Sequence, residues 1–144
     1  MLLVDPDIAA AAAIVEALPA TVDVAVRSDF LTARTRLRLN PPKLLVTALR
    51  LREYNGLHLV HLAAGAGLPT RSIVYTDVAD LSMAREIHRA GAFHEVRSQL
   101  AVTLPAYTSA VLPSHDRRDV IGRDRRQVAR GGRRAADQPR SSSC

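Results

Sequence analysis

The chain has few of the residues that build disulfide frameworks, zinc sites or aromatic binding surfaces. Its single cysteine, Cys144, is the last of 144 residues, so a disulfide within one chain and a cysteine-based zinc site are both excluded. Aromatic residues make up 3% of the chain, and tryptophan is absent. The hydrophobic core must therefore come from Leu, Val, Ile and Ala, which favours a domain of helices and a sheet over an aromatic-rich binding module.

Long apolar runs are also missing from the sequence. No run approaches the length that a membrane span requires. The apolar segment Met1–Val4 leads directly into Asp5, without the basic region and long apolar core of a signal peptide. We therefore expect no membrane association and a cytoplasmic location.

Positive charge is concentrated toward the end of the chain. The formal net charge is +6. Residues 1–112 hold 11 Lys or Arg against 10 Asp or Glu, whereas residues 113–144 hold 9 against 4. The last 32 residues are also rich in Gly and Ser and poor in apolar residues. This composition predicts one folded domain over residues 1–112 and an Arg-rich, disordered tail over residues 113–144.

Short apolar runs alternate with helical patterns along residues 1–112. A run of this kind followed by a helical pattern occurs five times, and Pro or Gly closes several of the helices. The predicted strands are residues 1–4, 22–26, 44–46, 72–76 and 93–96, and the predicted helices are residues 8–18, 29–39, 57–64, 81–90 and 103–112. Five such units predict an α/β domain with a doubly wound parallel sheet, whose functional groups gather at the carboxyl ends of the strands.

Three short stretches carry a more specific resemblance. They are Leu2–Asp7, Asn55–Val60 and Ala90–Phe93. In this order and spacing they resemble the first strand and acidic junction, the turn into the third helix, and the segment before the fifth strand of response regulator receiver (CheY-like) domains. The resemblance covers residues 1–112 and implies a flavodoxin-like (βα)5 fold with five strands and five helices.

The resemblance also implies a set of phosphorylation residues, most of which this chain lacks. A working receiver uses an aspartate as phosphoacceptor, an acidic pair that binds Mg²⁺, and a hydroxyl and a lysine that contact the phosphoryl oxygens. These positions map, in order, to Ala48, to Asp5 and Pro6 with Asp7 adjacent, to Thr76 and to Ser98. Only the hydroxyl is retained. We therefore expect a pseudo-receiver that is not an enzyme, is not phosphorylated at this position, has lost Mg²⁺ binding and needs no cofactor.

Several residues near this vestigial pocket have two interpretations. Asp5 and Asp7 are weak candidates for a residual cation site, but carboxylates at this junction more commonly cap the first helix. Arg50 either pairs with Asp5 in place of the metal ion or lies in solvent, and the sequence leaves both open. His58 and His61 have the spacing of two metal ligands without an evident third, so structural roles are favoured.

The resemblance suggests where such a domain contacts other proteins. In receivers the face formed by the fourth helix, fifth strand and fifth helix commonly mediates dimerisation or output contacts. On this chain its expected contributors are Leu81, Arg85, His88, Arg89, Glu95 and Tyr107, with Glu95 at the position of the usual switch aromatic. The predicted function is phosphorylation-independent signalling through protein partners, including a second copy as a homodimer.

Two other functions remain open from the sequence. The tail carries three arginine pairs that could contact phosphate backbones: Arg117 and Arg118, Arg125 and Arg126, and Arg133 and Arg134. Aspartates interrupt the run of arginines, and the tail has no aromatic residue for base stacking. A nucleic-acid-associated regulator is therefore one alternative. The other is a small-ligand sensor that reuses the pocket at the strand ends.

Overall fold

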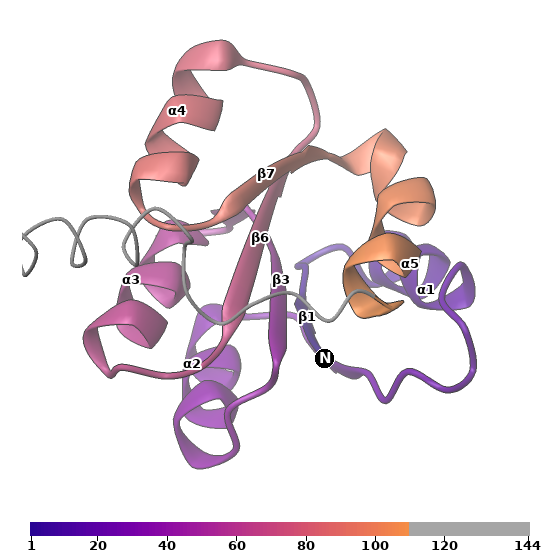
Figure 1. Cartoon of the computed structure of the whole chain (residues 1–144), viewed down its shortest axis with the longest axis horizontal. Coiled ribbons are helices and arrows are strands. Elements are labelled where there is room, and N and C mark those ends of the chain that lie inside the picture. Colours follow the sequence, from indigo (N-terminus) through magenta and orange to yellow (C-terminus); the bar gives the residue numbers. More distant parts are fainter. Residues whose placement is uncertain (110–144) are drawn as a thin grey trace, which may run out of the picture. The chain divides into compact units, whose positions relative to one another are not determined.

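A computed structural model describes residues 1–109 of the chain. Five parallel strands form one sheet in the order β2-β1-β3-β6-β7 (Figure 1). These strands are β1 (Leu2–Val4), β2 (Ala25–Arg27), β3 (Leu44–Ala48), β6 (Arg71–Thr76) and β7 (Phe93–Val96). The predicted flavodoxin-like arrangement of five βα units is therefore confirmed.

Helices cover both faces of this sheet. They are α1 (Ile8–Glu16), α2 (Phe30–Leu39), α3 (Leu57–Gly65), α4 (Leu81–Arg89) and α5 (Leu100–Ser109), and the 3₁₀ turn η1 (Arg97–Gln99) precedes the last one. Figure 1 shows α1 and α5 on one side of the sheet and α2, α3 and α4 on the other. None of the helices in the described part of the chain combines the length and apolar character of a membrane span.

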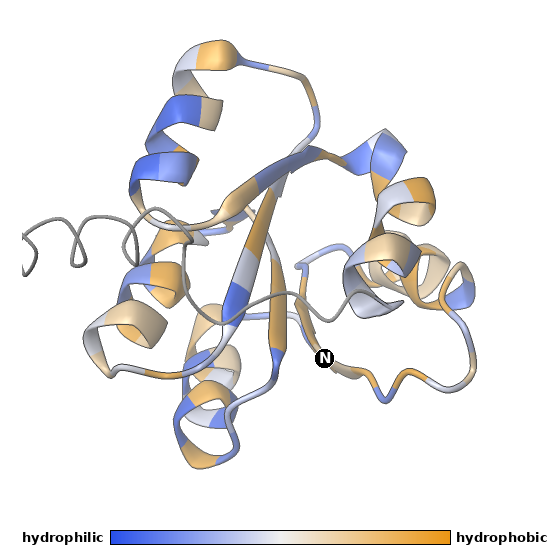
Figure 2. Ribbon diagram, viewed as in Figure 1, coloured by the Kyte–Doolittle hydropathy of each residue, from blue (hydrophilic) through white to orange (hydrophobic). Residues whose placement is uncertain are grey.

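The core lies along the central strands. Every residue of β3 is buried, as expected for a parallel strand with helices on both faces. Tyr75 in β6 is the largest fully buried side chain. Figure 2 shows the central strands as mainly hydrophobic and the helices as mixed, with hydrophilic residues prominent on α4. The sheet therefore supplies much of the apolar area whose burial stabilises the domain.

Aspartate side chains begin three of the helices directly after strand ends. Asp7 accepts a hydrogen bond from the amide of Ala10 (3.0 Å), and Asp29 accepts one from the amide of Thr32 (2.8 Å). Asp80 caps α4 in the same way. Such caps satisfy free amide groups and fix where each helix starts. The loops between strands and helices are therefore short, and they lie at the carboxyl edge of the sheet.

The structure differs from the sequence-based expectation in two segments. A small antiparallel hairpin, β4 (Arg50–Leu51) with β5 (Tyr54–Asn55), precedes α3 and was not expected. Two-residue strands are too short to show an alternating pattern. The helix predicted over residues 57–64 is α3, which extends to Gly65. It buries Leu57, Leu59, Val60 and Ala63, and His61 and Ala64 are exposed.

The last helix begins earlier than predicted. It starts at Leu100 rather than near Thr103, so Pro105 lies inside the helix instead of in its first turn. Leu100 and Leu104 are one turn apart and buried, and their packing fixes the helix in this register. Proline removes one helical hydrogen bond, and the carbonyl that would accept it belongs to Ala101, which is exposed to water. The predicted tail lies outside the described residues.

Candidate functional site

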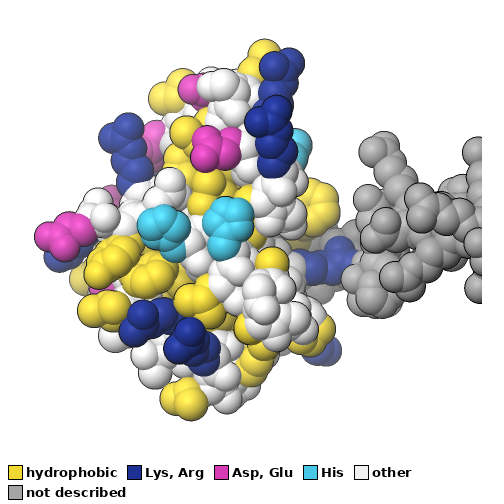
Figure 3. Space-filling model, turned by 90° about the vertical axis from the view of Figure 1, so that its left-hand side faces the viewer, with side chains coloured by type: hydrophobic (Ala, Val, Ile, Leu, Met, Phe, Trp, Pro, Cys, Tyr) yellow, Lys and Arg dark blue, Asp and Glu magenta, His cyan; other side chains and the backbone are white. Residues whose placement is uncertain are grey.

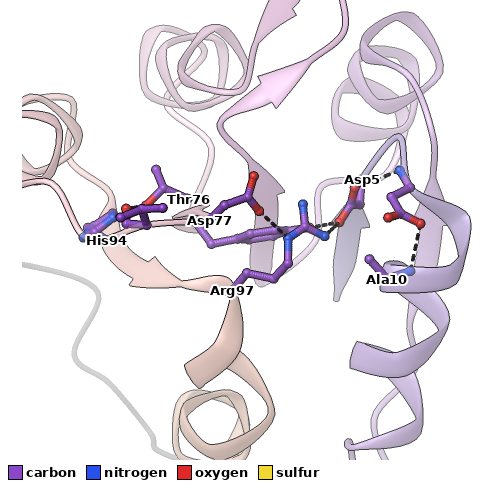
Figure 4. Close-up of polar contacts among 9 residues, drawn as sticks. Asp5, Ala10, Thr76, Asp77, His94 and Arg97 are labelled. Atoms are coloured by element: carbon purple, nitrogen blue, oxygen red, sulfur yellow. Dashed lines mark hydrogen bonds and ion pairs between the residues drawn. The ribbon is translucent and has the colours of Figure 1, made fainter.

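The centre of the candidate site is the carboxylate of Asp5, at the end of β1. Its side chain is 0% exposed. Oδ1 accepts a hydrogen bond from the amide of Asp7 (2.9 Å). Oδ2 accepts two more, from the hydroxyl of Tyr75 (2.5 Å) and from the guanidinium of Arg97 (2.8 Å) (Figure 4). Both oxygens therefore have protein partners, as a buried carboxylate requires.

Arg97 brings together the ends of strands that are not neighbours. It lies in η1, after β7, and β3 and β6 separate β7 from β1 in the sheet. Its guanidinium pairs with Asp5 at one end and with Asp77 through Nε at the other (2.7 Å). In Figure 4 the side chain extends between these two carboxylates. It also lies 5.2 Å from the centroid of the Tyr75 ring, within cation–π range.

The protonation states of this cluster follow from its surroundings. Burial, with the hydrogen bond and charge of Asp5 adding to it, raises the pKa of Tyr75 well above its usual value. Partial burial lowers the pKa of Arg97, but the hydrogen bond to Asp77 and the charge of Asp5 outweigh it, so the net pKa is raised. Tyr75 is therefore a neutral donor and Arg97 a cation at neutral pH.

The end of β3 is closed by a buried methyl group and a tight loop. Ala48, which the sequence predicted at the phosphoacceptor position, is buried. A Cβ added to Gly56 would lie 2.2 Å from the carbonyl oxygen of Ala48, and the Gly56 amide donates to the carbonyl of Leu49 (2.7 Å). The loop therefore packs directly against this strand end, and only glycine fits there.

Thr76, which the sequence predicted as the phosphoryl-contacting hydroxyl, belongs to a different group of contacts. Its Oγ1 donates to the carbonyl of Val78 (2.8 Å), which leaves that oxygen to accept from Nε2 of His94 (2.8 Å). In Figure 4, Thr76 and His94 lie on the opposite side of Asp77 and Arg97 from Asp5. The structure therefore does not bring Thr76 into contact with the Asp5 carboxylate.

The predicted pocket residues have distinct positions in the structure. Asp7 caps α1, as the favoured interpretation held. Arg50 is exposed in β4, and the guanidinium that contacts Asp5 is that of Arg97. Ser98 is exposed in η1, one residue beyond the arginine that reaches the pocket.

Arg97 is the residue of the candidate site that the sequence did not predict. It is the only Lys or Arg between residues 90 and 109, so the end of the fifth strand offered a single candidate cation. Counting from the receiver pattern instead gave the neighbouring Ser98. The 3₁₀ turn makes the difference, because it begins at residue 97 and changes the direction of the backbone there.

The donor set around Asp5 does not suit a metal ion. Mg²⁺ needs several hard oxygen ligands, whereas Asp5 has a guanidinium and a phenol hydroxyl as its side-chain partners. Within residues 1–109 no three or more His, Cys, Asp and Glu side chains are grouped so that they could hold a metal ion.

The predicted interaction face contains both exposed and anchored residues. Leu81 is 80% exposed, and its neighbours on α4 that were expected to contribute are exposed as well: Arg85, His88 and Arg89. Glu95 accepts a hydrogen bond from the hydroxyl of Tyr107 (2.9 Å). Partial burial and this contact raise the pKa of Tyr107 to about 12.

Phe93 adds an apolar group to this face. Its ring lies 5.6 Å from that of Tyr107, and the residue is 43% exposed. The tail arginines, by contrast, lie outside the described residues.

Comparisons with known proteins find similarity in structure alone. No family model and no curated protein sequence matches the chain. The signal receiver domain of a protein described as a Luxo repressor from Vibrio parahaemolyticus matches with a TM-score of 0.70 and 16% identity, over 91% of this chain and 96% of that one. The receiver domain of Francisella response regulator 1452 matches with a TM-score of 0.67 and 17% identity, over 74% and 89% of the two chains.

A third similar structure is a CheY-like response regulator receiver domain protein from Methanospirillum hungatei. Its TM-score is 0.60 with 16% identity, over 89% of this chain and 91% of that one. The strand order, the five helices and these three structures agree. The described part of the chain therefore has the fold of response regulator receiver domains.

Proposed function

We propose that this domain is a signalling module of the two-component type that acts through protein contacts and accepts no phosphoryl group. The observation that carries the proposal is the Asp5–Arg97 ion pair (2.8 Å). Receivers hold a metal ion and the phosphoryl group at the carboxyl ends of these strands. Here a side-chain cation from the protein itself neutralises the buried carboxylate.

The geometry of Arg97 supports this proposal in a second way. Because β3 and β6 lie between β1 and β7, the contact from Arg97 to Asp5 passes over the ends of both strands. The residue at the end of β3 is Ala48, which offers a methyl group and no carboxylate. A phosphoryl group at this edge would have neither a nucleophile nor a free metal ligand at Asp5.

The domain would signal through a protein-binding face, formed by α4, β7 and α5, that keeps one conformation. In a phosphorylated receiver, charge added at the pocket shifts the population between two arrangements of the opposite face. A permanent ion pair supplies no such input, so the face of α4, β7 and α5 stays available to partners. Leu81 and Phe93 give that face exposed apolar groups, and Arg85 and Arg89 give it charge.

Phosphorylation independence is tested with a small phosphodonor. The full chain is incubated with Mg²⁺ and acetyl phosphate and weighed by intact mass spectrometry, and amide NMR spectra are recorded with Mg²⁺ and beryllofluoride. We expect no added phosphoryl group and no saturable shift at Asp5 or Thr76. Arg97→Gln is the matched variant, because it removes the cation beside Asp5 and leaves Ala48 unchanged. A saturable response of the native chain in either assay would refute the proposal.

The protein-contact part of the proposal needs its own measurement. Sedimentation velocity over a wide concentration range reports self-association, and affinity capture with the full chain reports other partners. We expect a specific complex that Leu81→Asp and Phe93→Ser weaken, while Val26→Ser, at an exposed site on the opposite edge strand β2, leaves it unchanged. A monomer at every concentration with no captured partner would contradict it.

A further inference from the structure

A second surface of the domain has an uneven charge distribution. Residues 30–52 contain six Lys or Arg and no Asp or Glu. This segment covers α2, β3 and the first strand of the hairpin. The basic residues do not serve the Asp5 cluster, whose cation is Arg97. They therefore lie outside the ion-pair cluster at the strand ends.

Three residues of α2 form a continuous stripe on its surface. Leu31, Arg34 and Arg38 are spaced i, i+3 and i+7, so they share one side of the helix. Leu31 is 51% exposed, Arg38 is exposed and Arg34 is half-buried. The helix rises 1.5 Å per residue, so the stripe is roughly 10 Å long. It presents one apolar group followed by two cations.

A shallow hollow lies at the apolar end of this stripe. It is lined by Asp29, Phe30, Leu31, Leu51, Arg52, Glu53 and Tyr54. The rings of Phe30 and Tyr54 stack at 4.5 Å with an interplanar angle of 13°, and they hold the hairpin against the start of α2. Figure 3, which shows the side covered by α2, α3 and α4, has hydrophobic side chains next to groups of Lys, Arg and His.

We propose that this α2–hairpin surface binds an acidic segment of a protein partner. An apolar side chain of the partner enters the hollow beside Leu31 and Tyr54, and its carboxylates pair with Arg34 and Arg38. A helical segment with an apolar residue followed by Asp or Glu at i+3 and i+7 matches the stripe. The surface lies on α2 and the hairpin rather than on α4, β7 and α5, and the inference does not depend on whether the domain is phosphorylated.

The hollow itself argues for a protein partner rather than a nucleic acid. Asp29 and Glu53 stand among its lining residues, and a phosphate placed there would meet two carboxylates. An aliphatic side chain carries no charge into the hollow, so it avoids this repulsion. The partner's carboxylates lie one and two helical turns away from the hollow, beside Arg34 and Arg38. The surrounding segment, residues 30–52, contains no acidic residue that would repel them.

The test uses a synthetic peptide as the probe. A fluorescein-labelled helical peptide with Leu, Glu and Glu at i, i+3 and i+7 is titrated with the full chain at physiological salt. We expect saturable binding that Arg34→Glu with Arg38→Glu weakens by about tenfold, because two attractive ion pairs become repulsive. Leu31→Asp, at an exposed position, is expected to weaken it as well.

The matched control is Arg85→Glu with Arg89→Glu. These two arginines are exposed on α4, and their reversal changes the net charge of the chain by the same amount. Thermal unfolding verifies that each variant is folded. The proposal is overturned if both double variants weaken binding equally, if a Gln-for-Glu peptide binds as well, if no saturable binding occurs, or if a single-stranded oligonucleotide binds more tightly than the peptide.

Discussion

Replacing Arg97 with methionine tests the ion pair on which the proposed function depends. Methionine keeps much of the side-chain length and removes the charge and all five donors. The Asp5 carboxylate is 0% exposed and would retain only the hydrogen bonds from Asp7 and Tyr75. Breaking a fully buried ion pair costs about 3–5 kcal/mol. Because Arg97 is 31% exposed, water can replace part of the lost contact, so we expect a loss of about 2 kcal/mol in unfolding free energy.

The assay is urea unfolding of the full chain at neutral pH, followed by circular dichroism. A loss of this size in a domain of roughly 100 residues also lowers the melting temperature by about 8 °C. Arg89→Met is the control, since it removes an exposed arginine from α4 and is expected to change stability by less than about 0.5 kcal/mol.

The double variant Asp5→Asn with Arg97→Met separates the ion pair from packing. If the two charges stabilise one another, its cost is smaller than the sum of the single costs by about 1 kcal/mol or more. Additive effects, or an Arg97→Met variant as stable as the native chain, would refute the reasoning. In that case the buried carboxylate would not depend on Arg97.

Three further predictions concern other parts of the fold. Gly56→Ala is expected to cost about 3 kcal/mol in thermal unfolding, because its Cβ would lie 2.2 Å from a main-chain oxygen of β3, whereas Gly65→Ala meets nothing within 4 Å and is expected to be neutral or stabilising. Asp29→Ala removes the cap of α2 and should cost about 1 kcal/mol in urea unfolding, with Asp29→Asn close to native. The raised pKa of Tyr107, about 12 against 10.0, contributes stability that is present below pH 10 and lost as the pH rises toward 12. Ultraviolet titration should detect this pKa, and Glu95→Gln should lower it; an unchanged value would contradict the assigned contact.

Much of the fold could be predicted because its signals are local. Asp7, Asp29 and Asp80 each precede a helix and cap it, and β3 begins with the apolar run 44–46 because both of its faces are buried. Gly91 ends α4 with a φ of 90°, a conformation that favours glycine. These features depend on neighbouring residues, so the sequence displays them directly.

The candidate site could be predicted only in part because its contacts are not local. Asp5 was identified from its place after β1, but its partners Tyr75 in β6 and Arg97 in η1 are distant in the sequence. The turn η1 determines which side chain after β7 points toward β1. The sequence predicted Ser98 at this position, whereas the side chain that contacts Asp5 is that of the preceding residue, Arg97. The stacking of Phe30 on Tyr54 likewise depends on a hairpin that has no clear pattern of its own.

The Asp5–Arg97 contact has a consequence for the order in which the domain folds. It joins residues that are 92 positions apart, almost the full length of the described chain. During synthesis the first strand leaves the ribosome long before its counter-charge exists, so an early collapsed form would bury an uncompensated carboxylate. Assembly of the sheet around β1 is therefore disfavoured until β7 and η1 have been made. Through this ion pair, the segment after the last strand contributes to the stable burial of the first strand.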